Sequence, residues 1–179
     1  MKSSFFNLPI FLLAIALFLS ACASPPVAPV GDAERGMVVG YIGAPHGIKA
    51  VYLHAVGKAY IGAINMPRAH IQRNGNFMFV NLAPGRYYLA GFDDGTAPYW
   101  IPHDKESIRR AGVELKPGGL LYIGSYRVAN VEAPVWGRGS FDFERVRTPS
   151  ERTILQELRP MTEDSGWDTR IDKRLKSTN

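Results

Sequence analysis

Short runs rich in valine, isoleucine, tyrosine and phenylalanine fill the middle of the chain, and glycine, proline or asparagine interrupts them about every eight to twelve residues. This spacing is typical of an all-β domain, in which tight turns join short strands. The pattern begins at Met37 and continues to Arg147. It predicts at most nine strands: 37–42, 50–56, 59–64, 69–73, 76–82, 86–92, 113–115, 121–128 and 140–147.

The most distinct turn in this region is Asn74-Gly75. Both residues tolerate the positive φ values of a type I′ turn, so we expect a β-hairpin between 71–73 and the run that follows. In that run Phe77 and Phe79 alternate with two further apolar residues, so both faces of the strand are apolar. We therefore expect 76–82 to be a central strand that is covered on both sides.

Residues 75–89 read G-x-F-x-F-x-x-L-x-P-G-x-Y-x-L. This pattern resembles the signature of transthyretin-like, carboxypeptidase-regulatory-like β-sandwich domains, and 121–124 adds weaker support. The resemblance implies a mainly β, antiparallel sandwich of the transthyretin-like or immunoglobulin-like kind. It also implies a non-catalytic role in binding, spacing or stability. The predicted core residues are Phe77, Phe79, Leu82 and Leu89, with the chain turning at 84–85.

The periodicity becomes helical after residue 147. Thr148 is a candidate N-cap, with Pro149 at the first helical position and Glu151 at the third, which is the chemistry of a capping box. Three apolar residues then share one face until Pro160 ends the helix: Ile154, Leu155 and Leu158.

A second short helix is predicted after a cap at 165–168. Its apolar stripe consists of Trp167, Ile171 and Leu175, spaced four residues apart. Such a stripe requires burial, either against the sandwich or against a partner protein. We favour the sandwich, because short helices gain most of their stability from packing.

The N-terminal run from Leu8 to Leu19 is apolar, follows Lys2 and ends in small residues. It is typical of a signal peptide and too short to span a bilayer. Residues 19–22, Leu-Ser-Ala-Cys, resemble a bacterial lipobox, which implies a diacylglycerol thioether on Cys22 and cleavage just before it. The alternatives are a secretory peptide cut after an Ala-x-Ala-like site and an uncleaved anchor. In lipoproteins of this kind, an aspartate after the cysteine favours retention in the inner membrane. This chain has Ala23 at that position, so the same resemblance implies an outer-membrane lipoprotein that faces the periplasm.

Four segments follow from these patterns. They are a signal peptide (1–21), the lipidated cysteine with a proline-rich tether (22–36), the β-sandwich domain (37–147) and a helical extension (148–179). The tether carries three prolines and no periodicity. In polyproline II conformation, at roughly 3 Å per residue, it would hold the domain about 30 to 40 Å from the lipid.

The formal net charge is +5 and falls to +4 when Lys2 is removed. Basic and acidic residues are interspersed, so the chain lacks the extended basic face that nucleic-acid binding requires. Cys22 is the only cysteine. Once it carries lipid, no thiol is left for a disulfide, a nucleophile or a metal site, and we expect no cofactor.

Candidate chemistry is sparse. His54 and His70 could share a metal site with a nearby aspartate, but isolated strand histidines are the simpler interpretation, and we expect no metal. Asp93-Asp94-Gly95 is interpreted as a turn, and Ser140 lacks the GxSxG context of a hydrolase. The remaining enzyme hypothesis is an envelope hydrolase that uses His103 with Asp104, and we expect no enzyme.

Aromatic residues are the stronger candidates for binding. Tyr99 and Trp100 lie between two prolines in an expected loop, Trp136 follows Pro134, and Trp167 belongs to the helical stripe. Exposed aromatics in rigid loops bind proteins and sugars well, although Trp100 could instead fold inward. The sequence thus predicts a non-enzymatic envelope protein with a binding or structural role and a protein partner. The alternative is a glycan or small-ligand receptor centred on Tyr99, Trp100 and Trp136.

Overall fold

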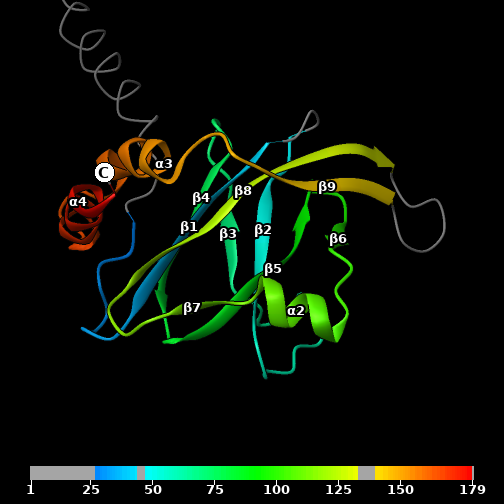
Figure 1. Ribbon diagram of the computed structural model, residues 1–179, viewed down its shortest axis with the longest axis horizontal. Coiled ribbons are helices and arrows are strands. Elements are labelled where there is room, and N and C mark those ends of the chain that lie inside the picture. Colours follow the sequence, from blue (N-terminus) through cyan, green and yellow to red (C-terminus); the bar gives the residue numbers. More distant parts are fainter. Residues whose placement is uncertain (1–26, 44–46, 133–139, 179) are drawn as a thin grey trace, which may run out of the picture.

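The computed structural model describes residues 27–43, 47–132 and 140–178 (Figure 1). Among these residues the strands are β1 (Gly36–Gly43), β2 (Ala50–Ala55), β3 (Arg68–His70), β4 (Asn76–Leu82), β5 (Gly85–Asp93), β6 (Pro98–Trp100), β7 (Val113–Leu115), β8 (Leu120–Glu132) and β9 (Ser140–Val146). The helices are α2 (Lys105–Ala111), α3 (Glu151–Leu158), the 3₁₀ turn η1 (Arg159–Thr162) and α4 (Trp167–Ser177). The predicted lipidation site Cys22 and the aromatic candidate Trp136 lie outside the described residues.

The strands form two sheets. Sheet A has the order β4-β1-β8-β9, and sheet B has the order β3-β2-β5-β6 with β7 also paired to β5. One cluster of buried apolar side chains fills the space between them, so the predicted β-sandwich is confirmed. The sandwich is not antiparallel throughout, because β1 and β8 run parallel with Val38 opposite Leu121. The intervening chain builds sheet B, which supplies the long crossover that a parallel pair needs.

The core between the sheets contains the residues that the alternation predicted. Phe77 is fully buried, and Phe79 and Leu89 are each 4% exposed. Leu82 is partly buried at the border of the same cluster. The period of two therefore correctly identified which side chains face inward.

Strand 76–82 is an edge strand of sheet A rather than a central strand. Both of its faces are nevertheless covered, as predicted. Phe77 and Phe79 face sheet B, while Met78 and Val80 pack on the apolar cluster beneath α3 and α4.

The predicted hairpin at Asn74-Gly75 is wrong. β3 pairs with β2 in sheet B and β4 pairs with β1 in sheet A, so the chain passes from one sheet to the other. A single bridge between Ile71 and Phe77 remains of the expected pairing. Gly75 has a φ of 91°, but the positive-φ residues do not include Asn74, so the turn is not type I′.

The turn at 84–85 also carries the chain between the sheets. Gly85 has a φ of 153°, and the Tyr87 hydroxyl donates a 2.8 Å hydrogen bond back to the carbonyl oxygen of Ala83. This contact fixes the corner between β4 and β5.

Two further strand predictions need correction. Segment 59–64 is not a strand: Ile61 and Ile64 form an isolated bridge across a tight turn, in which Gly62 has a φ of 58°. Conversely, the segment expected to be a loop contains β6, and the short helix α2 was not predicted.

The two C-terminal helices form a layer on the outer face of sheet A (Figure 1). Trp167 and Ile171 are fully buried, and Leu175 packs at the edge of the cluster. The prediction that this stripe packs on the sandwich is confirmed, and the prediction of Trp167 as a partner contact is wrong. The remaining buried members are Met37, Val39, Ile154, Leu155 and Leu158.

Helix α3 begins later than predicted. Its N-cap is Ser150, whose hydroxyl accepts a 3.2 Å hydrogen bond from the amide of Thr153, and not Thr148. The carbonyl of Pro149 accepts a 2.6 Å hydrogen bond from the Ser125 hydroxyl, which ties the chain to β8 before the helix starts. Pro160 lies within η1, just beyond the end of α3 at Leu158.

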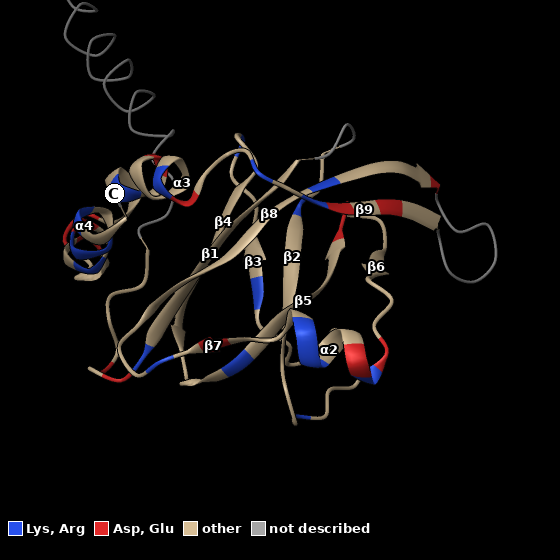
Figure 2. Ribbon diagram, in the orientation of Figure 1, with Lys and Arg blue, Asp and Glu red and all other residues tan. Residues whose placement is uncertain are grey.

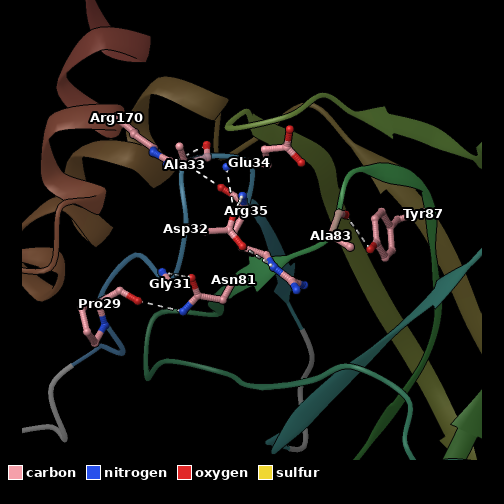
Figure 3. A network of polar contacts seen from close by, with 10 residues as sticks. All are labelled: Pro29, Gly31, Asp32, Ala33, Glu34, Arg35, Asn81, Ala83, Tyr87 and Arg170. Carbon is pink, nitrogen blue, oxygen red and sulfur yellow. Dashed lines mark hydrogen bonds and ion pairs between the residues drawn. The ribbon is translucent and has the colours of Figure 1, made fainter.

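Residues 27–35, which we call the strap, lie along the domain (Figure 3). The amide of Asn81 donates a 2.8 Å hydrogen bond to the Pro29 carbonyl and accepts a 2.7 Å bond from the Gly31 amide. The Arg170 guanidinium donates to backbone carbonyls of Ala33 and Arg35. The described part of the expected tether therefore does not extend freely away from the domain.

Candidate functional site

The outer face of sheet B is the candidate site. Of the two sheets, the α3–α4 layer packs on side chains of sheet A, from β1, β4 and β8. The opposite face of the sandwich, the outer face of sheet B, carries several aromatic side chains and an arginine. Strand alternation places Tyr52, His54, Arg68, Tyr88 and Trp100 there, because their sequence neighbours point into the core.

One row of side chains crosses all four main strands of sheet B. The register places Arg68 opposite Tyr52, Tyr52 opposite Gly91, and Gly91 opposite Trp100. Because Gly91 has no side chain, the rings of Tyr52 and Trp100 approach each other with centroids 5.5 Å apart. A Cβ at Gly91 would lie 2.3 Å from the carbonyl oxygen of Tyr99, so this position requires glycine.

A buried carboxylate fixes one end of this row. Asp93 accepts a 2.6 Å hydrogen bond from the Tyr52 hydroxyl and a 3.1 Å bond from the Arg68 guanidinium. Burial and the hydrogen bond to Asp93 raise the pKa of Tyr52, so the phenol stays protonated. The neighbouring Tyr52 hydroxyl and Asp93 carboxylate raise the pKa of Arg68.

The two ends of the row are accessible while its middle is buried. The side chain of Arg68 is 41% exposed, and Trp100 is 37% exposed, whereas Tyr52 is 6% exposed. The Arg68 guanidinium also lies 6.0 Å from the centroid of the Tyr52 ring. The site thus presents a cation and an indole whose positions are set by contacts beneath them.

A second aromatic group continues the surface beyond this row. His54 stacks on Tyr88 at 5.0 Å, and Tyr60 from the β2–β3 loop meets His54 edge-on at 4.8 Å. His103 meets the Tyr88 ring edge-on at 4.9 Å, with its Nε2 3.0 Å from the Leu89 carbonyl oxygen. These rings cover the outer face of sheet B, whereas helices cover the outer face of sheet A.

Exposed apolar side chains border the same face. Among the described residues, four large apolar side chains are exposed, and all four belong to the β2 end, the β2–β3 loop or β6 of sheet B. Ile61 is 81% exposed and Ile64 is 64% exposed, at the tip of the loop that carries Tyr60. The other two are Val56 and Trp100. Apolar groups gathered on one side of a domain mark an interaction surface.

The structure separates the predicted aromatic pair. Tyr99 is 3% exposed, stacks on Phe92 at 5.1 Å and donates a 3.1 Å hydrogen bond to Asp94. Its predicted exposure is therefore wrong: β6 alternates, so that Tyr99 points inward and Trp100 outward. Asp94 forms the predicted turn, and hydrogen bonds from the Thr96 hydroxyl and amide lower its pKa to about 2.

The residues of the enzyme hypothesis have structural roles. Asp104 is the N-cap of α2 and accepts a 2.6 Å hydrogen bond from the Ser107 amide. His54 and His70 are not cross-strand neighbours, since the residue opposite His70 is Ala50. Within the described ranges, no group of three or more histidine, cysteine or acidic residues could hold a metal ion.

Sequence reasoning missed Tyr52 and Arg68. Alternation within 50–56 already placed Tyr52 and His54 on one face and Val51 and Leu53 on the other. The pairing of β3 beside β2, which brings Arg68 to Tyr52, has no comparable signal in the sequence.

Comparisons with known proteins add little to this geometry. No family model matches the chain, and no curated protein sequence matches it. The fold is similar to crystal structures of DUF3823 family proteins from Parabacteroides merdae ATCC 43184 and Bacteroides ovatus ATCC 8483, at 17% and 16% identity with TM-scores of 0.30 and 0.32. The matches cover 64% of this chain and 60% and 59% of those chains. Likenesses this distant carry no argument about function.

Among the described residues, no helix is both long enough and apolar enough to cross a membrane.

Proposed function

We propose that this protein is a lipid-anchored, non-enzymatic binding protein of the cell envelope, and that the outer face of sheet B receives a protein partner. The observation that carries the proposal is that the four exposed large apolar side chains of the described residues, Trp100 among them, all belong to the β2 end, the β2–β3 loop or β6 of sheet B, whose outer face also carries Arg68. Tryptophan, tyrosine and arginine dominate the energetic centres of protein interfaces, especially where packing beneath them fixes their positions.

The anchor rests on the N-terminal sequence. The apolar run from Leu8 to Leu19 and the lipobox-like residues 19–22 support a lipid on Cys22, and Ala23 supports export to the outer membrane facing the periplasm. A chain held at a membrane by two or three acyl groups does not dissociate readily, so it can recruit a partner to that surface.

The polar contacts of the surface support a binding role over a catalytic one. Asp93 is engaged by Tyr52 and Arg68, and Asp104 by the first turn of α2. These contacts hold the side chains in place and leave the Trp100 ring and the Arg68 guanidinium to meet a ligand.

A glycan or small-ligand receptor is the second candidate. It is favoured by one observation, the exposed Trp100 indole in the same row as Arg68, since an aromatic ring beside polar groups also suits a sugar. The aliphatic side chains of Ile61 and Ile64 favour the protein partner instead.

Photo-crosslinking in intact cells tests the proposal. A photoreactive amino acid at Ile61 or Ile64 should form an adduct with one defined protein, and the same group at the exposed Gln156 of α3 should not. Arg68→Ala combined with Trp100→Ala should abolish the adduct at Ile61. If Ile61 and Ile64 give no protein adduct, the protein-binding proposal is wrong. Saccharide binding that requires Trp100 would then support the receptor alternative.

A further inference from the structure

The described chain begins at the helix layer. Val27 and Val30 pack on the apolar cluster beneath α3 and α4. The Trp167 indole nitrogen donates a 3.0 Å hydrogen bond to the Ala28 carbonyl, and the Val30 amide donates a 3.0 Å bond to the Ser165 carbonyl. The strap is therefore fixed to α4 and to the turn before it. The point of exit, where the chain that leads to Cys22 leaves the domain, is thus Val27 and not the start of β1.

Further contacts hold the strap along its length. The Gly118 amide donates a 2.8 Å hydrogen bond to the Glu34 carbonyl. The Arg170 guanidinium lies 4.6 Å from the Trp167 ring centroid and donates to the Gly118 carbonyl at 3.1 Å. Figure 3 shows Arg170 reaching the strap from the C-terminal helices. Contacts with three separate parts of the domain make release of the whole strap costly.

The fixed strap leaves little chain between the domain and a lipid on Cys22. Only residues 23–26 separate Cys22 from Val27. Five Cα–Cα steps span at most about 18 Å, whatever their conformation. A tether that was free up to Met37 would instead reach about 50 Å.

The domain is thicker than this reach. Helix layer, sheet A and sheet B are stacked in that order, with sheets about 10 Å apart and a helix about 10 Å in diameter. In Figure 1, whose horizontal direction is the longest axis, α3 and α4 lie at the left and β6 lies toward the right. The outer face of sheet B is thus on the side away from the point of exit.

Charge on the helix layer is balanced overall, with six basic and six acidic side chains in residues 151–178, and the basic ones are concentrated at the C-terminal end of α4. Arg174 is paired with Glu151, and Arg159 with Asp172. Lys173 and Lys176 are exposed on α4 and form no ion pair with the described part of the chain. Figure 2 shows both basic and acidic residues on α3 and α4. Lysines close to a bilayer are attracted by anionic headgroups.

We infer that the α3–α4 layer faces the bilayer at close range. The short segment between Cys22 and Val27 then keeps the outer face of sheet B turned away from the membrane. This inference rests on the proposed lipid anchor at Cys22. The occupant of the helix-layer surface is the lipid bilayer that holds the acyl chains. The binding surface then points into the compartment where a partner can reach it.

Depth-dependent quenching tests the orientation. Because the lipid occupies Cys22, the only native cysteine, a cysteine introduced elsewhere is a unique thiol. Full-length lipidated protein carrying Gln156→Cys, Thr169→Cys or Lys58→Cys is labelled with NBD and reconstituted in vesicles with headgroup-labelled quencher lipid. All three positions are exposed. We expect quenching at 156 and 169 of at least twofold and little quenching at 58, on the β2–β3 loop.

A flexible Gly-Ser insertion of about fifteen residues between Pro26 and Val27 is the matched control, and it should remove most quenching at 156 and 169. Quenching at 58 that equals or exceeds that at the helix positions, or no quenching at any position, would overturn the inferred orientation. Flotation of the protein with vesicles and the mass of the N-terminal peptide report the anchor separately. If these fail, the proposed anchor is wrong, whereas anchored protein with another quenching pattern contradicts the orientation alone.

Discussion

The indole nitrogen of Trp167 donates a hydrogen bond to the backbone carbonyl of Ala28, 139 positions earlier in the chain. This contact joins the start of the described chain to the last helix. It also satisfies the one polar atom of a tryptophan that is otherwise fully buried against sheet A.

Replacement of this tryptophan should therefore weaken the whole domain. Trp167→Ala removes the largest side chain of the helix-layer cluster and should lower the free energy of unfolding by about 3–5 kcal/mol. Urea denaturation of a soluble form that begins at residue 27 measures the change. Leu175→Ala, at the partly exposed edge of the same stripe, should cost clearly less. Equal losses for the two variants would contradict the packing described above.

Gly91→Ala should disrupt the centre of the binding surface. The added methyl group would meet the Tyr99 carbonyl at 2.3 Å and the Trp100 ring at 3.0 Å, so β5 and β6 must separate. We expect a loss of about 1–3 kcal/mol in thermal or urea unfolding and a changed near-ultraviolet spectrum.

Gly57→Ala is the matched control for this variant. Gly57 has a φ of 85° and open space around its Cβ position, so the substitution should cost only about 1 kcal/mol of backbone strain. An unchanged near-ultraviolet spectrum for Gly91→Ala would count against the close approach of the two rings.

Because of the turn after β5, the free energy of unfolding should depend on pH in the acid range. Hydrogen bonds from Thr96 lower the pKa of Asp94 from 3.8 to about 2 in the folded state. A lowered pKa stabilises the fold above pH 3.8, and this contribution is lost as the pH falls through about 2. The difference in unfolding free energy between the wild type and Asp94→Asn should therefore be largest near neutral pH and shrink in acid. A difference that is constant with pH would show that the charge of Asp94 is not responsible.

Asn81 should control the order of the strap. Asn81→Ala removes both bonds to the strap and places alanine at a φ of 59°, with an expected loss of about 2 kcal/mol. Amide hydrogen exchange at Gly31 should become much faster. Asn81→Asp keeps the acceptor for Gly31 but loses the donor to Pro29, so it should lie between the wild type and the alanine variant. Unchanged exchange in both variants would mean that the strap is held without Asn81.

Cys22→Ser tests the anchor itself. Serine lacks the thiol on which the thioether forms, so the precursor should be neither lipidated nor cleaved before residue 22. The mass of the N-terminal peptide measures both steps. Ser24→Ala, two residues further on, should mature normally. Normal maturation of Cys22→Ser would remove the basis for the proposed localisation.

Alternation along a strand predicts which side chain faces the core, and most of the correct predictions from the sequence depend on this rule. It placed Phe77, Phe79 and Leu89 correctly, and applied to β6 it would have placed Tyr99 inside. Alternation does not determine which strands are neighbours. The expected hairpin at Asn74-Gly75 failed for that reason, because β3 and β4 belong to different sheets.

Other features could not be predicted from the pattern of side chains, because contacts and dihedral angles of the backbone determine them. The strap has no apolar periodicity, and its partners are carbonyl groups contacted by Trp167 and Arg170 from the far end of the chain. In 59–64, Ile61 and Ile64 suggested a strand, but positive φ values at Gly62 and Asn65 close a turn that leaves both isoleucines in solvent. The candidate site was partly predicted, through Trp100 alone.

The parallel pairing of β1 with β8 also constrains the order in which the protein can fold. β1 emerges first during synthesis, yet one of its neighbours arrives only after all of sheet B has been made, and its outer face waits for α3 and α4. Until then an apolar strand edge is unprotected and can pair with another chain. Contacts so distant in sequence favour slow folding. Nascent chains of this protein should therefore depend on chaperones that shield β1 until the C-terminal helices close over it.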